Sequence, residues 1–431
     1  MVLLLACVCQ FMVILDAAIV NVALPSIQHD LGFTATGLAW VVNGYSLTFA
    51  GFMLLGGRAA DLFGHRRMLV AGLGVFTAAS LAAGLATSAG LLVAGRAAQG
   101  VGAAMLAPAT LAVLNTHFVT PATRTRAFAA WSAAGGVGGM AGALAGGALT
   151  TLLSWRWVFL INVPIGAVLI AAALLALPAR RVRERPSLDL LGALTGTAGL
   201  AMLIYGVMHG AGLPMLAGAA LLGLFLLVEA RFAARPMVPL GLFRIRGVAV
   251  GNVMLLLFGG IAVAMWYFTS LLLQNELGFT ALRAGLGQTP AAVTFVLVAR
   301  WAGALPPRIA VPAGCGCLVA GFGWLAAADG GYLTAVLGPT LIVAAGIALT
   351  FPAMMAAATS GVPEGDAGTA GGLATTSNQV GSAVALAVMA TAATYDHVFT
   401  LAALIGLAIA VTGLLLPRSA HTPAMTSGTA R

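Results

Sequence analysis

Long apolar segments, separated by short polar breaks, run from one end of this sequence to the other. About 20 apolar residues cross the hydrocarbon core of a bilayer as one α-helix, and a helix satisfies all of its backbone hydrogen bonds internally. Only 7% of the 431 residues are charged, against roughly 25% in a soluble domain. The polar groups are too few to cover a water-facing surface. We therefore expect an all-α protein that crosses a membrane many times.

A window of roughly 20 residues divides the chain into fourteen expected spans. They are residues 3–25, 37–56, 68–87, 91–114, 127–150, 157–177, 188–208, 213–230, 248–273, 284–301, 313–328, 334–355, 370–393 and 398–416. The two longest polar breaks separate them into groups of six, two and six, a division that suggests the repeated halves of secondary transporters. The expected units are a six-helix bundle (1–178), a two-helix insert with its loops (179–247), a second six-helix bundle (248–417) and a tail (418–431).

The arginines indicate how the chain is oriented. All 20 basic residues are arginine, and cytoplasmic loops are the ones that carry excess positive charge. With both termini cytoplasmic, Arg156 and Arg283 fall outside, Arg96 lies within the fourth span, and seventeen arginines fall on the inner side: Arg58, Arg66, Arg67, Arg124, Arg126, Arg180, Arg181, Arg183, Arg185, Arg231, Arg235, Arg244, Arg246, Arg300, Arg308, Arg418 and Arg431. Because these charges form no single patch, the net charge of +9 gives no reason to expect a nucleic-acid partner.

Two charged side chains, Asp16 and Arg96, lie deep inside expected spans. A charge at the centre of a membrane helix costs about 2.5–3.5 kcal/mol, so each residue needs a partner, and each is a suitable partner for the other. Gln99 follows Arg96 by one helical turn, on the same face. The pair is either a static lock between two helices or a functional element.

The sequence shows no cluster typical of an enzyme or a metal site. Cys7, Cys9, Cys315 and Cys317 form two C-x-C pairs, but residues two apart on a helix point in different directions. The six histidines are scattered singly, whereas an active site needs converging titratable groups. We therefore expect no metal, no cofactor and no enzymatic activity. An integral-membrane enzyme or a sensory subunit is the remote alternative.

The break between the second and third spans reads Gly57-Arg58-Ala59-Ala60-Asp61-Leu62-Phe63-Gly64-His65-Arg66-Arg67. It resembles the loop G-x-L-A-D-x-x-G-R-R/K of the major facilitator superfamily, with Ala59 in place of the leucine and His65 in place of the first base. In that family the loop acts as a conformational latch. The resemblance assigns this role to Gly57, Asp61, Gly64, Arg66 and Arg67.

Five further segments resemble signatures of one branch of this superfamily, the fourteen-span drug:proton antiporters. They are residues 15–25 (LDAAIVNVALP), 96–104 (RAAQGVGAA), 155–166 (WRWVFLINVPIG), 273–279 (LQNELGF) and 376–381 (TSNQVG). The resemblance implies a major facilitator fold in which two extra helices lie between two six-helix bundles. It also implies transport by alternating access, powered by a proton gradient.

The sequence departs from the branch at three places. Antiporters carry G-x-x-x-G-P-x-x-G-G in helix five, and this chain has Gly138, Gly142, Gly146 and Gly147 but Ala143 in place of the proline. The second-half copy of the latch loop, near residues 300–308, is short and eroded. The second half shows no deep acid, which argues against a pump for multivalent cations.

The expected helices are rich in glycine, with 56 in the chain. Small residues let membrane helices pack closely, and these contacts are either fixed or allow the helices to slide past one another.

Asp16 and Arg96 are the candidates for proton coupling. Burial favours the neutral form of a carboxyl group, whereas a nearby cation favours the carboxylate. A changing distance between Asp16 and Arg96 would therefore load and unload a proton.

Other polar and aromatic residues inside the spans are candidates for a substrate cavity. They are Asn21, Asn43, Tyr45, Gln99, Asn252, Trp266, Tyr267, Asn378 and Gln379. Interhelical hydrogen bonding or an interfacial position is the alternative for each. A mainly apolar cavity with few fixed charges suits lipophilic compounds, neutral or with one positive charge.

These observations favour proton-coupled efflux of lipophilic drugs or antibiotics across a bacterial inner membrane. The expected partners are a small lipophilic substrate, protons and the lipid bilayer, and we expect a monomer. A dedicated exporter of one endogenous metabolite or natural product is the alternative function.

Overall fold

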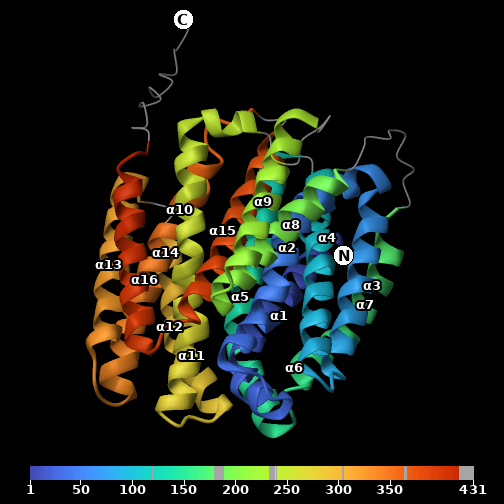
Figure 1. Ribbon diagram of the computed structural model, residues 1–431. Helices are drawn as coiled ribbons and strands as arrows, with labels where there is room; N and C mark the ends of the chain where they lie inside the picture. The colour runs from blue at the N-terminus through green and yellow to red at the C-terminus, as the bar shows by residue number, and fades with distance from the viewer. Residues whose placement is uncertain are drawn as a thin grey trace, which may run out of the picture.

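The computed structural model describes residues 1–118, 120–178, 189–232, 238, 240–302, 305–363 and 366–416. Within these ranges every regular element is helical, and the long helices run side by side as one bundle (Figure 1). The expected linker at 179–188, residues 303–304 of the eroded second-half loop, and the tail from residue 417 onwards lie outside the described residues.

The first half of the chain forms five long helices and one interrupted helix. They are α1 (Val2–Leu31), α2 (Ala35–Phe63), α3 (His65–Gly84), α4 (Ala89–His117), α5 (Pro121–Leu152) and the pair α6 (Trp157–Leu160) and α7 (Asn162–Ala176). Two begin at a side-chain cap: the Thr34 hydroxyl accepts the Gly37 N–H at 3.0 Å and the Ser88 hydroxyl accepts the Leu91 N–H at 3.3 Å. Such caps pair amide groups that a helix start otherwise leaves open.

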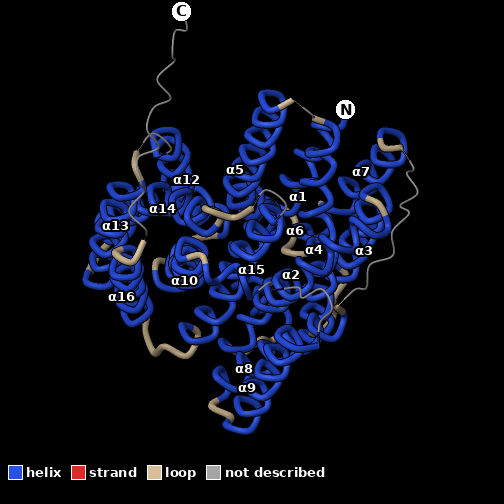
Figure 2. The backbone as a smooth tube through the Cα atoms, turned by 90° about the horizontal axis from the view of Figure 1, so that it is seen from above, coloured by secondary structure: helices blue, strands red, loops and turns tan. Residues whose placement is uncertain are grey.

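The two-helix insert consists of α8 (Leu190–His209) and α9 (Gly212–Leu227), followed by a π-turn, η1 (Val228–Phe232). The Asp189 carboxylate caps α8 by accepting the Gly192 N–H at 2.9 Å. The two helices pack on each other, and α8 also packs on α2 and on α15 of the second half. Viewed end-on, the insert lies at the edge of the bundle (Figure 2).

The second half contains more irregular segments. They are η2 (Leu240–Arg244), α10 (Arg246–Val263), η3 (Ala264–Phe268), α11 (Thr269–Leu271), η4 (Leu272–Glu276), α12 (Ala281–Ala302), α13 (Pro307–Ala327), η5 (Tyr332–Leu337), α14 (Gly338–Ala358), α15 (Ala367–Met389) and α16 (Tyr395–Gly413). α10 to η4 form one continuous rod in which two π-helical turns, η3 and η4, interrupt the α-helix. π-turns are rare and occur frequently at functional sites.

Thirteen helices of the described chain are long and apolar enough to cross a membrane, and each coincides with an expected span. The remaining expected span, 370–393, coincides with α15, which is rich in Gly, Ser and Thr. α15 packs between α10 and α2, and small residues are typical of such close helix contacts in membranes. The all-α fold expected from the sequence is thus confirmed.

Some boundaries differ from the expected ones. α1 continues to Leu31 rather than ending near Pro25, because a transmembrane helix tolerates an internal proline when neighbours satisfy the freed backbone group. α13 begins at Pro307 rather than at residue 313. Proline fits the first turn of a helix, where its missing N–H costs nothing.

Candidate functional site

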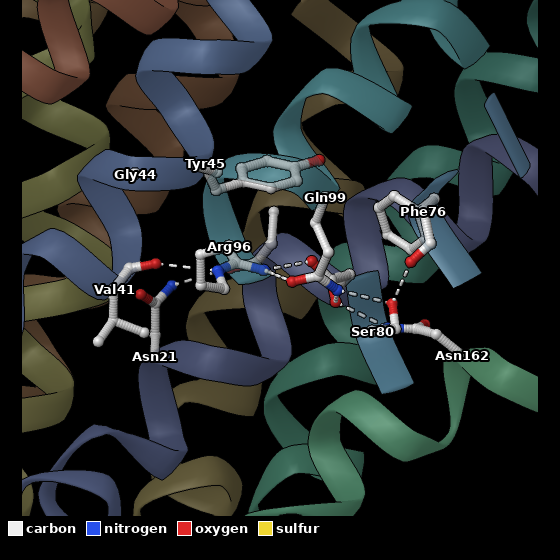
Figure 3. A network of polar contacts seen from close by, with 12 residues as sticks. Asn21, Val41, Gly44, Tyr45, Phe76, Ser80, Arg96, Gln99 and Asn162 are labelled. Carbon is white, nitrogen blue, oxygen red and sulfur yellow. Dashed lines mark hydrogen bonds and ion pairs between the residues drawn. The ribbon is translucent and has the colours of Figure 1, made fainter. Parts of the chain in front are cut away.

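Asp16 and Arg96 form an ion pair inside the first half of the molecule. The Arg96 Nη1 atom lies 2.6 Å from Asp16 Oδ2, and the side chains are 1% and 0% exposed. The pairing expected from the sequence is therefore present, between α1 and α4. Figure 3 shows Arg96 within this polar network, with Val41, Tyr45 and Gln99 around it. Breaking such a buried pair by removing one partner costs about 3–5 kcal/mol, because it leaves an uncompensated charge.

Arg96 is held by residues of α1, of α2 and of its own helix, α4. Its Nε–H donates to the Val41 carbonyl of α2 at 2.9 Å, and its Nη1 also donates to Gln99 Oε1 at 3.0 Å. The guanidinium carbon lies 4.4 Å from the centre of the Tyr45 ring, a distance at which cation and ring attract. Arginine suits this position because its planar head supplies several donors in fixed directions.

Asp16 accepts hydrogen bonds from two amides as well as from Arg96. Gln99 Nε2 donates to Asp16 Oδ1 at 3.0 Å, and Asn162 Nδ2 donates to the same oxygen at 2.7 Å. Gln99 also donates to the Ser80 hydroxyl at 2.7 Å, which in turn donates to the Phe76 carbonyl at 2.7 Å. The Asp16 carboxyl group thus joins donors from α4 and α7 at one point.

Two members of this network, Ser80 and Asn162, were not among the sequence candidates. Both side chains are fully buried. Asn162 lies within the expected sixth span and within the W-R-W-V-F-L-I-N segment, so a search for polar side chains inside apolar spans would have found it. Its Oδ1 atom and the Tyr45 hydroxyl are buried without a hydrogen-bond partner.

The candidates for the substrate cavity fall into two groups. Tyr45 and Gln99 belong to the ion-pair network, and Gln99 is fully buried there rather than open to a cavity. The others lie elsewhere on α1, α2, the α10–η3 rod and α15: Asn21, Asn43, Asn252, Trp266, Tyr267, Asn378 and Gln379.

Several residues of the second group make hydrogen bonds between helices. Asn252 Oδ1 accepts the Ser377 hydroxyl at 2.8 Å, and Asn378 Nδ2 donates to the Leu255 carbonyl at 3.3 Å. These contacts join α10 to α15. Asn43 differs, because it is fully buried and both polar atoms of its side chain lack a partner.

The expected latch loop lies where α2 turns into α3. Gly64 has a φ of 90°, a backbone conformation that favours glycine. Arg66 Nη2 donates to the Leu174 carbonyl near the end of α7 at 2.9 Å, whereas Arg67 is exposed. Gly57 packs near Pro108 of α4. The side chain of Asp61 lies outside the described residues.

The helix-five glycines are contact points for two different helices. A Cβ atom on Gly138 or Gly146 would lie 2.7 Å from the Phe11 carbonyl oxygen or 2.6 Å from that of Ile19, both on α1. A Cβ atom on Gly142 would lie 2.6 Å from Ala18 Cβ on the same helix. Gly147 instead faces α12, where its Cβ would lie 2.7 Å from the Ala281 carbonyl oxygen. Three glycines of the motif therefore pack α5 against α1 of its own half. Gly147, the residue after Gly146, packs α5 against α12 of the other half.

Comparisons with known proteins agree with this architecture. A model of the Major Facilitator Superfamily matches residues 6–386. The chain is 43% identical to the cephamycin export protein of Amycolatopsis lactamdurans, over 97% of this chain and 93% of that protein. It is 35% identical to the puromycin resistance protein of Streptomyces alboniger, over 89% and 80%.

Solved structures show the same fold at low sequence identity. A D-xylose–proton symporter superposes with a TM-score of 0.70 at 14% identity, over 96% of this chain and 97% of that one. An auto-inhibited peptide transporter of the POT family gives 0.71 at 14% identity, over 96% of both chains. The family match, the full-length relatives and the shared helical bundle together show that this chain belongs to the major facilitator superfamily.

Proposed function

We propose that this protein exports small lipophilic antibiotics or drugs by alternating access, coupled to the entry of protons. The observation that carries the proposal is the buried Asp16–Arg96 ion pair, which ties α1 to α4 deep in a bundle of membrane helices. Relatives along most of the chain are named for cephamycin export and for resistance to puromycin and lincomycin.

In the proposed mechanism Asp16 is the group that carries the proton. A proton on Asp16 removes the negative charge that Arg96, Gln99 and Asn162 now share. The attraction between α1 and α4 weakens, and the helices become free to shift. The membrane potential contributes about 2.3 kcal/mol per 100 mV for each charge that crosses, so one proton supports a substantial substrate gradient.

The proposed setting is a bacterial inner membrane with both chain ends in the cytoplasm. The seventeen arginines on one side support this orientation, because cytoplasmic loops concentrate positive charge. The protein acts as a monomer with a six-helix bundle, a two-helix insert and a second bundle. The proton gradient is the energy source, and no cofactor takes part.

Transport into inverted membrane vesicles tests the coupling. A panel of dyes and antibiotics is offered with and without an imposed pH gradient, using wild-type protein, Asp16→Asn and Asp396→Asn. Asp396 is an exposed carboxylate on α16, so its substitution controls for the loss of one negative charge. We expect gradient-dependent uptake by the wild type and Asp396→Asn only. Full gradient-dependent uptake by Asp16→Asn would refute the assigned role.

A dedicated exporter of one natural product is the second candidate function. It is favoured by the relative of 43% identity, which is named for the export of a single antibiotic class. A resistance panel in an efflux-deficient host separates the two functions. Protection against chemically unrelated compounds supports broad efflux, and protection against one compound class supports the dedicated exporter.

A further inference from the structure

Two side chains of the second half bind backbone carbonyls of α1. The Ser270 hydroxyl of α11 donates to the Asn21 carbonyl at 3.1 Å, and Gln274 Nε2 of η4 donates to the Val22 carbonyl at 3.1 Å. Gln274 Nε2 also lies 3.2 Å from the Ser270 oxygen. The two side chains therefore form one connected group, and Ser270 is fully buried within it.

The Asn21 carbonyl is available because of Pro25. In an α-helix the carbonyl of residue 21 is paired with the N–H of residue 25, and proline has no N–H. α1 nevertheless continues as a helix from Val2 to Leu31. Without a partner from another element, this carbonyl would remain unsatisfied in a dry interior, which is costly in a membrane. Ser270 supplies that partner.

The irregular shape of the α10–η4 rod presents both donors to α1. Two π-turns, η3 and η4, lie on either side of the three residues of α11. Residues four apart on a helical rod lie on neighbouring positions of one face, and Ser270 and Gln274 have this spacing. The π-turns thus coincide with the place where the rod meets the other half.

Other contacts between the halves lie at the same end of the molecule. The Leu282 N–H at the start of α12 donates to the Thr151 hydroxyl at the end of α5, at 3.1 Å. Val22, Ala143 and Ala281 form a small buried apolar cluster between α1, α5 and α12. This end of the bundle is therefore closed by polar and apolar contacts together.

We propose that Ser270 and Gln274 are gating residues, which hold this end closed through the carbonyl freed by Pro25. The inference rests on the proposed alternating access, under which this is the outer end, where substrate leaves. In the open state, water entering the cleft replaces Ser270 as the partner of the Asn21 carbonyl. In the closed state no water is available, so the hydroxyl is required. Because of Pro25, the Asn21 carbonyl of α1 can thus exchange its partner between Ser270 and water. We call this carbonyl the docking point.

Cysteine labelling measures this gate without substrate or a proton gradient. The native Cys7, Cys9, Cys315 and Cys317 are replaced by alanine, and Ala143→Cys is introduced into the buried cluster of Val22, Ala143 and Ala281. A membrane-impermeant maleimide is applied to right-side-out and to inverted vesicles. We expect Ser270→Ala and Gln274→Ala each to raise the labelling rate from the outer side by roughly fivefold, the ratio that one typical net hydrogen bond gives.

Thr269→Val is the matched control. Thr269 is buried beside Ser270, but its hydroxyl bonds to the Ala264 carbonyl of its own rod at 3.3 Å. Thr269→Val loses a hydroxyl that is bonded within its own rod, so its labelling rate stays at the parental value. Labelling of the two gate variants at the rate of Thr269→Val would overturn the proposal.

Pro25→Ala tests the origin of the docking point. Alanine restores the N–H that pairs with the Asn21 carbonyl inside α1, so Ser270 loses its acceptor. We expect faster labelling in Pro25→Ala and no further increase when Ser270→Ala is added. Independent, multiplying effects of the two substitutions would contradict the proposed link. If the labelling rates shift as expected but the wild type transports nothing, efflux is refuted and the gate stands. If the wild type transports substrate but the labelling rates do not shift, the gate is refuted and efflux stands.

Discussion

Asn162, the first residue of α7, donates a hydrogen bond of 2.7 Å to the carboxylate of Asp16 in the middle of α1. This contact joins the first and last helices of the first half at the residue proposed to carry the proton. Protonation of Asp16 therefore bears on α7 as well as on α4, to which Arg96 belongs. The Asp16 carboxylate links α1 to α4 and α7, so its charge affects the contacts among these three helices.

Asn162→Ala removes one hydrogen bond to a charged group. Such bonds contribute about 1.5–3 kcal/mol, against about 0.5–1.5 kcal/mol for a neutral one. We therefore expect a larger loss of thermal stability in detergent than for Ser377→Ala, which breaks a neutral bond to Asn252. Equal melting temperatures for the two variants would show that the Asn162 contact is not charge-assisted.

Arg96→Ala leaves Asp16 buried without its counter-charge. We expect a loss of about 3–5 kcal/mol in the free energy of unfolding. The double variant Arg96→Ala, Asp16→Asn removes the orphaned charge and should recover part of that loss, since contacting residues behave non-additively. Denaturation of the purified proteins measures both. A double variant less stable than Arg96→Ala would contradict the ion pair as the source of the effect.

Arg96→Lys separates charge from geometry at the same position. Lysine keeps the positive charge but cannot reproduce the fixed fork that reaches Val41, Asp16 and Gln99 together. We expect proton-coupled transport to fall by about tenfold, the factor that corresponds to 1.4 kcal/mol. Transport at the wild-type rate would indicate that charge alone is sufficient.

Gly146→Ala and Gly136→Ala form a matched pair on α5. A Cβ on Gly146 would lie 2.6 Å from the Ile19 carbonyl oxygen, whereas a Cβ on Gly136 meets no atom within 4 Å. We expect Gly146→Ala to force α5 away from α1 and to lower thermal stability and transport. Gly136→Ala should be neutral or stabilising by about 0.5–1 kcal/mol, because alanine is the better helix former. Similar behaviour of the two variants would argue against a close contact between α1 and α5.

A disulfide across the two halves tests whether the closed end must open during transport. The Thr151 hydroxyl accepts the backbone N–H of Leu282 across the α5–α12 contact, which places the two residues close together. In a background without other cysteines, oxidation of Thr151→Cys, Leu282→Cys should stop transport, and a reductant should restore it. Each single cysteine variant serves as the control under the same oxidant. Undiminished transport by the fully cross-linked protein would rule out opening at this end.

Much of the architecture follows from the pattern of apolar runs. The spans agree with the apolar pattern. The ion pair of Asp16 and Arg96 agrees with it as well, because a charge deep in hydrocarbon has few ways to be satisfied. Ser80 and Asn162 are recognisable as polar side chains inside apolar spans, but their partners are not, since a single serine or asparagine in a span has several possible neighbours. Gln99, a candidate for the substrate cavity, completes the ion-pair network.

The sequence by itself determined that this chain is a membrane-spanning helical bundle with one costly pair of charges, since helix length and charge burial are local properties. Only the tertiary structure decided which helices meet. Asn162 reaches Asp16 from 146 positions away, and Ser270 reaches the Asn21 carbonyl from 249 positions away. The sequence shows that Pro25 frees a carbonyl, but the donor that satisfies it depends on how the two halves pack. Such long-range pairing is set by the shape of the whole bundle, which no single segment encodes.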